Sequence, residues 1–268
     1  KNFDIADFNL NTPSMSQDYN VSLSGGNEKG HYYAGLGYND SEGTAYGNEY
    51  RRMTFTFNGD YKINKWLTSS SNFSYANASW NDLPPTQTAE ANYFSRVLSL
   101  PPTFRGYNAD GEMLLGPNTG DGNQQINFDS FVRDNKTDKF TMSQSFTIDF
   151  MKGLSLKLSG LWYYNEGMYE SFNKDYLQSP GVTNTSHSSS AQFDRTIDQT
   201  YNAILNFNKQ INKDHYVDAM AGFEYYDSYN RGFSASGSGA PTDAFADLSY
   251  TVNGEGKRSI DSWHGRQR

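Results

Sequence analysis

Apolar and polar residues alternate along eight segments of the chain, and this period of two predicts β-strands with one apolar and one polar face. In the first segment Tyr19, Val21 and Leu23 alternate with asparagine and serine. The segments are about ten residues long, which is the length that a tilted strand needs to cross a bilayer. The predicted strands cover residues 19–24, 32–38, 53–61, 67–75, 140–150, 154–164, 201–208 and 217–225, and a ninth is predicted to begin near Leu248-Ser249-Tyr250.

The connections between these segments are alternately short and long. The short ones are rich in Gly, Asn and Lys, and outer-membrane barrels show the same sorting, with short turns on the periplasmic side and long loops outside. A water-soluble sandwich has no reason to sort its loops by end. The sequence therefore predicts an all-β fold: a transmembrane antiparallel β-barrel with long extracellular loops and short periplasmic turns. The short connections are residues 25–30, 62–65, 151–153 and 209–214, and the long ones are about 39–48, 77–138, 165–196 and from 227 onward.

The longest connection, Asn77–Asp138, exceeds what a compact domain leaves structureless, so it should carry function or additional structure. Part of it shows helical spacing of apolar residues before Pro101-Pro102, which predicts one short amphipathic helix. We expect this helix to pack the loop onto the barrel rim rather than to contact a ligand. The residues with helical spacing are Ala89, Tyr93, Phe94, Val97 and Leu98.

Composition supports the barrel. The mean hydropathy of −0.80 is that of a polar chain, yet the chain holds 20 tyrosines, 18 phenylalanines and 4 tryptophans. A barrel reconciles the two, because alternate residues line a polar lumen and aromatic girdles mark both interfaces. The net charge of −8 argues against a nucleic-acid partner. No apolar run approaches 18 residues, so no transmembrane helix is predicted, and no secretion signal opens the chain.

The sequence contains no recognisable catalytic constellation. Its four histidines are scattered without a paired spacing, and its cysteine count of zero excludes a thiolate metal site. Nucleophile-elbow and phosphate-loop motifs are absent. The loop segments 108–112 and 118–123 faintly resemble calcium-binding loops but lack the full ligand series. We therefore expect no enzymatic activity, no cofactor and no metal.

Aromatic and polar loop residues are the candidates for substrate binding. Aromatic rings in loops can stack on sugar rings or on peptide side chains, although for any single one of them packing within the loop is the simpler interpretation. The candidate substrate-binding residues are Trp80, Tyr93, Phe104, Tyr107, Asn108, Asp110 and Tyr169.

The first 115 residues contain a series of short motifs that are each weak but are specific as an ordered set. They are Tyr19-Asn20-Val21-Ser22-Leu23-Ser24-Gly25-Gly26, Lys29-Gly30, Tyr32-Tyr33, Leu36-Gly37-Tyr38, Glu42-Gly43, Arg52, Asn58-x-Asp60-Tyr61, Trp66-Leu67, Leu100-Pro101-Pro102 and Tyr107-Asn108-Ala109-Asp110-Gly111. This set resembles the SusC/RagA-like family of TonB-dependent outer-membrane transporters, which occur in Bacteroidota. The rest of the chain matches that family only in its strand rhythm.

The resemblance implies an integral protein of the bacterial outer membrane that imports an oligomeric nutrient, a glycan or a peptide. Members of the family have an N-terminal plug and a 22-stranded barrel whose lumen is plugged. They are driven by TonB and capped by a SusD-like surface lipoprotein. Residues 1–268 would then be the N-terminal part of the barrel, about eight strands, with the plug and the TonB box upstream of Lys1. Whether two transporter–lipoprotein pairs form a dimer is left open.

Two other interpretations remain at this point. One is a small passive outer-membrane barrel of eight strands with an anchoring or adhesin role, since barrels of that size have interiors filled by side chains. The other is a secreted, soluble β-protein that binds glycans, which would explain the aromatic residues without lipid.

Overall fold

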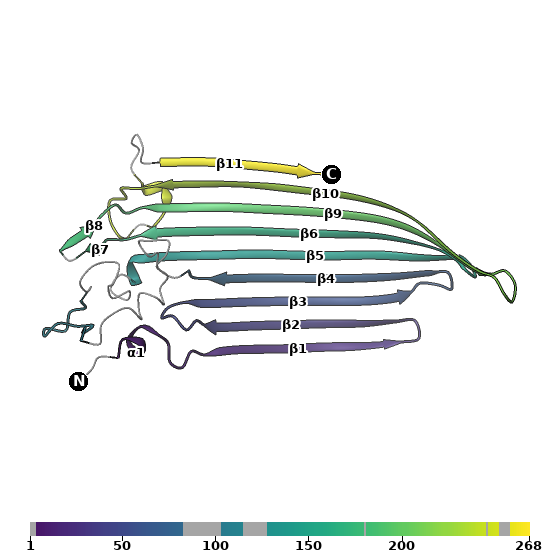
Figure 1. Cartoon of the computed structure of the whole chain (residues 1–268), viewed down its shortest axis with the longest axis horizontal. Coiled ribbons are helices and arrows are strands. Elements are labelled where there is room, and N and C mark those ends of the chain that lie inside the picture. Colours follow the sequence, from purple (N-terminus) through teal and green to yellow (C-terminus); the bar gives the residue numbers. More distant parts are fainter. Residues whose placement is uncertain (1–3, 83–102, 115–127, 180, 245, 252–257) are drawn as a thin grey trace.

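Nine strands of the chain form one antiparallel sheet in the order β1-β2-β3-β4-β5-β6-β9-β10-β11 (Figure 1). The structure, a computed structural model, describes residues 4–82, 103–114, 128–179, 181–244, 246–251 and 258–268. Apart from the β7–β8 hairpin, which lies between β6 and β9, each strand pairs with the next one along the chain. The strands are β1 Ser16–Asn27, β2 Gly30–Glu42, β3 Glu49–Lys62, β4 Leu67–Trp80, β5 Phe131–Met151, β6 Leu154–Asn173, β7 Tyr176–Ser179, β8 Val182–Asn184, β9 Ser189–Gln210, β10 Tyr216–Gly237 and β11 Arg258–Gln267.

All eight predicted strands are present, and the all-β fold is confirmed. The prediction of a ninth strand near Leu248 was wrong, because Leu248–Tyr250 forms a 3-10 helix and the ninth strand of the sheet is β11. The Asp247 carboxylate accepts a hydrogen bond of 2.7 Å from the Ser249 N–H, and this contact caps the 3-10 helix. A short helix, α1 (Ile5–Asn9), precedes β1. No helix in the described part of the chain is long and apolar enough to span a membrane.

Four strands are far longer than the alternating pattern indicated. β5, β6, β9 and β10 contain 20 to 22 residues each, so much of the predicted 165–196 connection is strand, as are both ends of the predicted Asn77–Asp138 connection. Polar residues on both faces of these extensions hid them from a search for amphipathic alternation. The predicted helix at Ala89–Leu98 lies outside the described residues.

The register brings the apolar residues of successive strands onto one face of the sheet. Val21 pairs with Leu36, which pairs with Phe55, and the same row continues through Tyr75, Phe140 and Tyr164. Ring contacts tie these strands together: Phe73 lies 5.5 Å from Phe55 and 5.0 Å from Phe140 between ring centroids. One face is therefore a continuous apolar and aromatic surface.

The opposite face carries Ser, Thr and Asn in register. Asn72 pairs with Ser143, and its side-chain amide donates a 3.0 Å hydrogen bond to the Ser143 hydroxyl. Among the described residues only four hydrophobic side chains are buried, namely Ala45, Ala78, Phe172 and Ala240. The sheet thus has no apolar core of its own, and its apolar face needs hydrocarbon or another apolar phase to cover it.

The apolar surface forms a slanted band. Val21 of β1 lies in the middle of its apolar segment, and the row of paired residues that starts at Val21 reaches Tyr229 of β10 after seven steps from strand to strand. The apolar segment of β10, however, is centred on Ala221, which lies eight residues closer to the short turns than Tyr229. The band therefore shifts by about 1.1 residues, or about 3.8 Å, per strand, against a strand spacing of about 4.8 Å. A band parallel to a membrane then requires strands tilted by about 38°.

The turns show the same slant independently. β1 ends at Asn27, six residues beyond the row, and β10 begins at Tyr216, thirteen residues before Tyr229. The difference of seven residues over seven steps corresponds to a tilt of about 35°. Both values agree with the tilt of roughly 35–45° found in transmembrane barrels. The apolar band and the turns can therefore each lie level with one membrane.

We predict that Leu158→Arg destabilises the folded protein by about 2–4 kcal/mol, because Leu158 faces outward near the middle of the band, where an arginine meets hydrocarbon. The matched control is Ser159→Arg, one residue further along β6 on the polar face. The measurement is denaturant unfolding of the intact protein in lipid vesicles. Equal destabilisation by both substitutions would contradict the assignment of the two faces.

Candidate ligand site at the loop end of the sheet

The described parts of the long connections lie at one end of the sheet, together with α1, the β7–β8 hairpin and the 3-10 helix (Figure 1). The short turns between β1 and β2, β3 and β4, β5 and β6, and β9 and β10 lie at the other end. The candidate residues from the sequence analysis that the structure describes all belong to the end with the long connections.

Two of the predicted site residues, Trp80 and Tyr169, come together on the polar face. They occupy one row of the sheet on either side of Asn135, and their rings meet edge to face at 6.2 Å between centroids. Both were predicted as loop residues, and this was wrong: Trp80 ends β4 and Tyr169 lies in β6. The extended strands hold this pair more firmly than a loop would.

The surroundings of the pair fix its geometry. Asn135 is buried, and its side-chain amide donates a 2.8 Å hydrogen bond to Asp82. Gly167 leaves room for the Tyr169 ring, since a Cβ there would lie 2.6 Å from the Tyr169 hydroxyl oxygen. Burial raises the pKa of the Tyr169 hydroxyl, and the charge of Asp194 raises it further. Tyr169 is therefore a neutral hydroxyl, able to donate and accept hydrogen bonds, at physiological pH.

A cavity of about 620 Å³ lies between the N-terminal segment, the β2–β3 connection and the β4–β5 connection. Two edge-to-face aromatic pairs line it: Phe8 with Tyr107 at 5.4 Å and Tyr46 with Phe128 at 5.5 Å between centroids. Met113 and the carboxylates of Asp4, Asp7 and Asp129 complete the lining. Such a surface offers ring faces to apolar groups or sugar rings, and acceptors to N–H and O–H donors.

The remaining predicted site residues have other positions. Asn108 holds a turn, because its Oδ1 accepts hydrogen bonds from the N–H groups of Asp110 and Glu112 at 2.9 and 2.8 Å. Asp110 is exposed in that turn and Phe104 is half-buried. Tyr93 lies outside the described residues. Of the six candidates that the structure describes, Tyr107 alone lines the cavity, and Trp80 and Tyr169 form the pair on the polar face. The role of these residues in substrate binding stays a prediction.

Sequence reasoning missed Phe8, Tyr46 and Phe128, which also line the cavity. They lie in segments without periodicity, and only the folded connections bring them together. It also missed a group with metal-ligand chemistry: Asp175, His187 and Asp243, whose ligand atoms lie within 4.8 Å of one another. Asp175 and His187 lie on either side of the β7–β8 hairpin, and Asp243 lies in the connection after β10. The three residues match no motif, so no spacing rule could have found them.

Comparisons with known proteins bear on the fold. No family model matches the chain. The TonB-dependent receptor P39 of Formosa agariphila is 22% identical over 209 residues, which are 78% of this chain and 19% of that protein. The chain thus spans about a fifth of this curated relative.

Solved structures of an importer have the same fold. The RagAB peptide transporter matches with a TM-score of 0.84 at 19% identity, over 99% of this chain and 30% of that one. The RagAB peptide importer matches with a TM-score of 0.82 in both the open-open and the closed-closed state, at 19% and 18% identity. These matches cover 94% and 98% of this chain and 28% and 30% of the importer chain.

Sequence and fold therefore point to the same relatives. The comparisons confirm the resemblance to SusC/RagA-like transporters, with this chain matching a part of their length, and they agree with an outer-membrane location. The chain covers less than a third of each solved relative, and its nine-stranded sheet is open.

We predict that Gly47→Ala disturbs the cavity. Gly47 has a φ of +72°, and an added Cβ would lie 1.8 Å from the end of the Phe128 ring. The Phe128 ring has to move, which disturbs its contact with Tyr46, so hydrogen exchange in residues 44–48 and 128–130 should accelerate. Gly111→Ala is the matched control, because Gly111 has a φ of +84° but nothing within 4 Å of the added Cβ. It should show only the backbone penalty of about 1–2 kcal/mol. Identical exchange in both variants would contradict the packing described.

Proposed function

We propose that this chain is a section of the barrel wall of an outer-membrane importer of the SusC/RagA-like kind. The observation that carries the proposal is the slanted apolar band, whose slope gives a strand tilt within the range of transmembrane barrels. A soluble sheet has no reason to shift its apolar residues by about one residue per strand in step with its turns. Similarity to the TonB-dependent receptor and to the RagAB importer supports the same conclusion.

The open sheet suggests a large barrel. In the described part of the chain β1 and β11 each pair on one side only, and unpaired edges are not tolerated in hydrocarbon. In our proposal, further strands outside residues 1–268 close the wall into the 22-stranded, plugged barrel that the resemblance implies, with the plug and the TonB box upstream. The sheet does not support an eight-stranded anchoring barrel, because in the described part of the chain β1 pairs with neither β10 nor β11.

The two faces divide the work of transport. The apolar face contacts lipid, and the Ser, Thr and Asn face lines the lumen, where neutral hydrogen-bonding groups let a polar cargo pass without holding it tightly. Cargo is bound first at the loop end, by the aromatic cavity and the Trp80–Tyr169 pair. Since binding and passage require no bond to be broken, the protein acts as a transporter and not as an enzyme.

The partners follow from the same proposal. TonB acts on the part of the protein upstream, and a SusD-like lipoprotein covers the loop end. The cargo is an oligomeric nutrient, a peptide or an oligosaccharide. The carboxylates of Asp4, Asp7 and Asp129 favour a peptide, because they can accept hydrogen bonds from its amino groups and attract basic side chains.

We predict that Trp80→Ala in the intact transporter raises the half-saturating cargo concentration about twofold to thirteenfold, which corresponds to the roughly 0.5–1.5 kcal/mol of an aromatic contact. Trp162→Ala is the matched control: Trp162 lies on the lipid face, where its ring contacts Tyr201 at 5.7 Å. Uptake of labelled peptides and labelled oligosaccharides, normalised to folded protein, is the measurement. If Trp162→Ala impaired uptake as much as Trp80→Ala, the proposal that Trp80 faces the lumen would be contradicted.

We also predict that deletion of residues 81–130 abolishes capture of cargo or of the lipoprotein while the barrel still folds. The deleted range is shorter than the predicted Asn77–Asp138 connection, because both ends of that connection belong to β4 and β5. Heat-modifiable migration on gels reports folding, and co-purification reports the lipoprotein. A deletion variant that no longer folds would contradict the proposal that the barrel folds without residues 81–130.

A further inference from the structure

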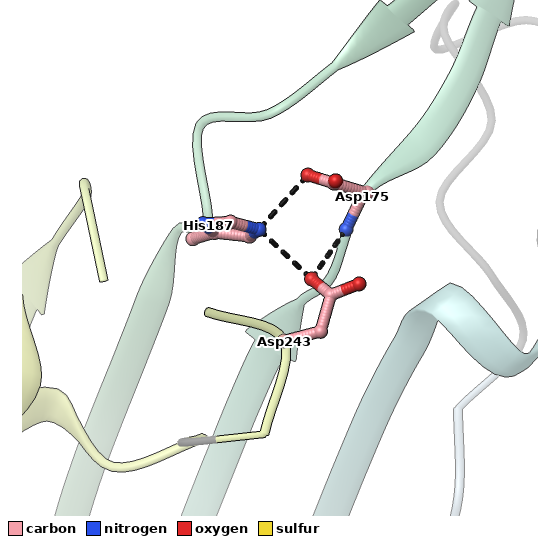
Figure 2. Close-up of side chains that lie close together, drawn as sticks. All are labelled: Asp175, His187 and Asp243. Atoms are coloured by element: carbon pink, nitrogen blue, oxygen red, sulfur yellow. Dashed lines mark hydrogen bonds and ion pairs between the residues drawn. The ribbon is translucent and has the colours of Figure 1, made fainter. Parts of the chain in front are cut away.

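Three side chains with metal-ligand chemistry meet at the loop end, outside the aromatic cavity. Asp175 lies between β6 and β7, His187 between β8 and β9, and Asp243 in the connection after β10. One oxygen of each carboxylate lies 2.8 Å from His187 Nε2, and Figure 2 shows both carboxylates turned toward that nitrogen. Asp243 Oδ1 also accepts a 2.8 Å hydrogen bond from the Asp175 N–H.

The other ring nitrogen of His187 fixes the tautomer. Nδ1 lies 2.7 Å from the carbonyl oxygen of Ala240, and because a carbonyl oxygen only accepts, Nδ1 carries the hydrogen. In the neutral ring, Nε2 then presents a lone pair to two carboxylates, which also carry lone pairs. This contact is repulsive unless a positive charge lies between the three atoms. Metal-binding histidines have the same arrangement, with the second nitrogen donating to a backbone carbonyl.

The directions of the two oxygens favour a metal ion over a proton as that charge. Nε2 is buried and makes no hydrogen bond, although both oxygens are close enough. A ring N–H donates along the direction of its N–H bond. Two close oxygens that accept no hydrogen bond must therefore lie to either side of this direction. A metal ion placed about 2.0–2.1 Å from Nε2 along this direction would lie between the two oxygens. The usual bond angles at such an ion place neighbouring ligand atoms about 3.0–3.4 Å apart. The two distances from Nε2 to the carboxylate oxygens would therefore increase by only about 0.2–0.6 Å on metal binding.

The charge of the group also calls for a cation. Among the described residues no lysine or arginine nitrogen lies within 4.0 Å of Asp175 or Asp243, so His187 is their sole ion-pair partner there. Two carboxylates this close repel each other. A divalent ion would offset both charges.

The backbone and the packing hold the imidazole in position. His187 is the one non-glycine residue in the described part of the chain with a positive φ, +43°. Its ring stacks on Phe172, at 6.3 Å between centroids with an angle of 20° between the planes. Phe172 is itself 1% exposed. Sparsely populated backbone conformations such as this one concentrate at ligand-binding positions.

We propose that Asp175, His187 and Asp243 bind one divalent transition-metal ion, with Zn²⁺ as the reference ion. One imidazole and two carboxylates suit zinc and its neighbours, whereas calcium and magnesium prefer oxygen alone. Three protein ligands leave one position for water. The ion ties the connection between β6 and β9 to the connection after β10, which already touch where the Gly239 N–H donates to the Ser186 carbonyl at 2.7 Å.

The test uses the intact protein, purified in detergent, stripped of metal and titrated with Co²⁺ as a spectroscopic probe. Wild-type protein should show a ligand-field absorption that Zn²⁺ displaces. Asp175→Asn and Asp243→Asn should each weaken binding at this site by more than the tenfold to hundredfold typical of a second-sphere partner. Asp214→Asn and His215→Ala are the matched controls, because both residues lie in the turn between β9 and β10 and should bind like wild type.

A second measurement on wild-type protein decides the matter even where a variant fails to fold. Zn²⁺ should slow hydrogen exchange in residues 181–188 and 238–244, and a chelator should reverse the effect. Cobalt absorption that is equal in wild type and in the Asp175→Asn/Asp243→Asn double variant would overturn the proposal. Hydrogen exchange that neither Zn²⁺ nor the chelator changes in these two segments would also overturn the proposal. A protonated His187 would then be enough to explain why the two carboxylates lie close to Nε2.

Discussion

A strand inside a bilayer cannot leave its backbone N–H and C=O groups unbonded, because no water is present to bond them. This constraint gives each strand a neighbour on both sides, and the register with that neighbour decides which side chains share a face. Here the register runs from β1 to β10 with one irregularity, between Asp149 and Met151. Alternation along each strand then collects the apolar residues on one face and the Ser, Thr and Asn residues on the other.

The strands differ in how far they extend beyond the apolar band. β1 begins at Ser16, five residues above the centre of its apolar segment, whereas β10 continues for sixteen residues above Ala221 to Gly237. At about 3.3 Å per residue and a tilt of about 38°, β10 rises roughly 40 Å above the middle of the band, against roughly 13 Å for β1. The later strands therefore project well beyond the bilayer. On this projecting part lie Tyr169 and the residues around His187.

How much the sequence could predict depended on whether a feature was local. Period-two patterns such as Phe55 and Phe57 against Thr54 and Thr56 located eight of the nine strands of the sheet. The alternation of short and long connections predicted that the short turns share one end of the sheet. The extensions of β5, β6, β9 and β10 were missed, because above the bilayer neither face has to be apolar. The cavity around Phe8 and the cluster around His187 were missed for another reason: their residues are distant in sequence, and only the closing of the loops brings them together.

Site-directed spin labelling can test most directly whether alternate residues face hydrocarbon along strands tilted by about 35–38°. Because the chain has no cysteine, single spin-labelled cysteines can be placed along β1, β6 and β10 of the intact protein in lipid vesicles. Collision rates with oxygen and with a water-soluble nickel chelate report on lipid exposure and depth. We expect contact with oxygen at Leu156 and Leu158 and contact with the chelate at Ser155 and Ser159. We also expect Val21 and Ala221 to lie at equal depth. If Val21 lay at the same depth as Tyr229, its partner in the row of paired residues, the tilt would be contradicted. If oxygen and the chelate were excluded equally from all positions along β6, a membrane-spanning sheet would be contradicted.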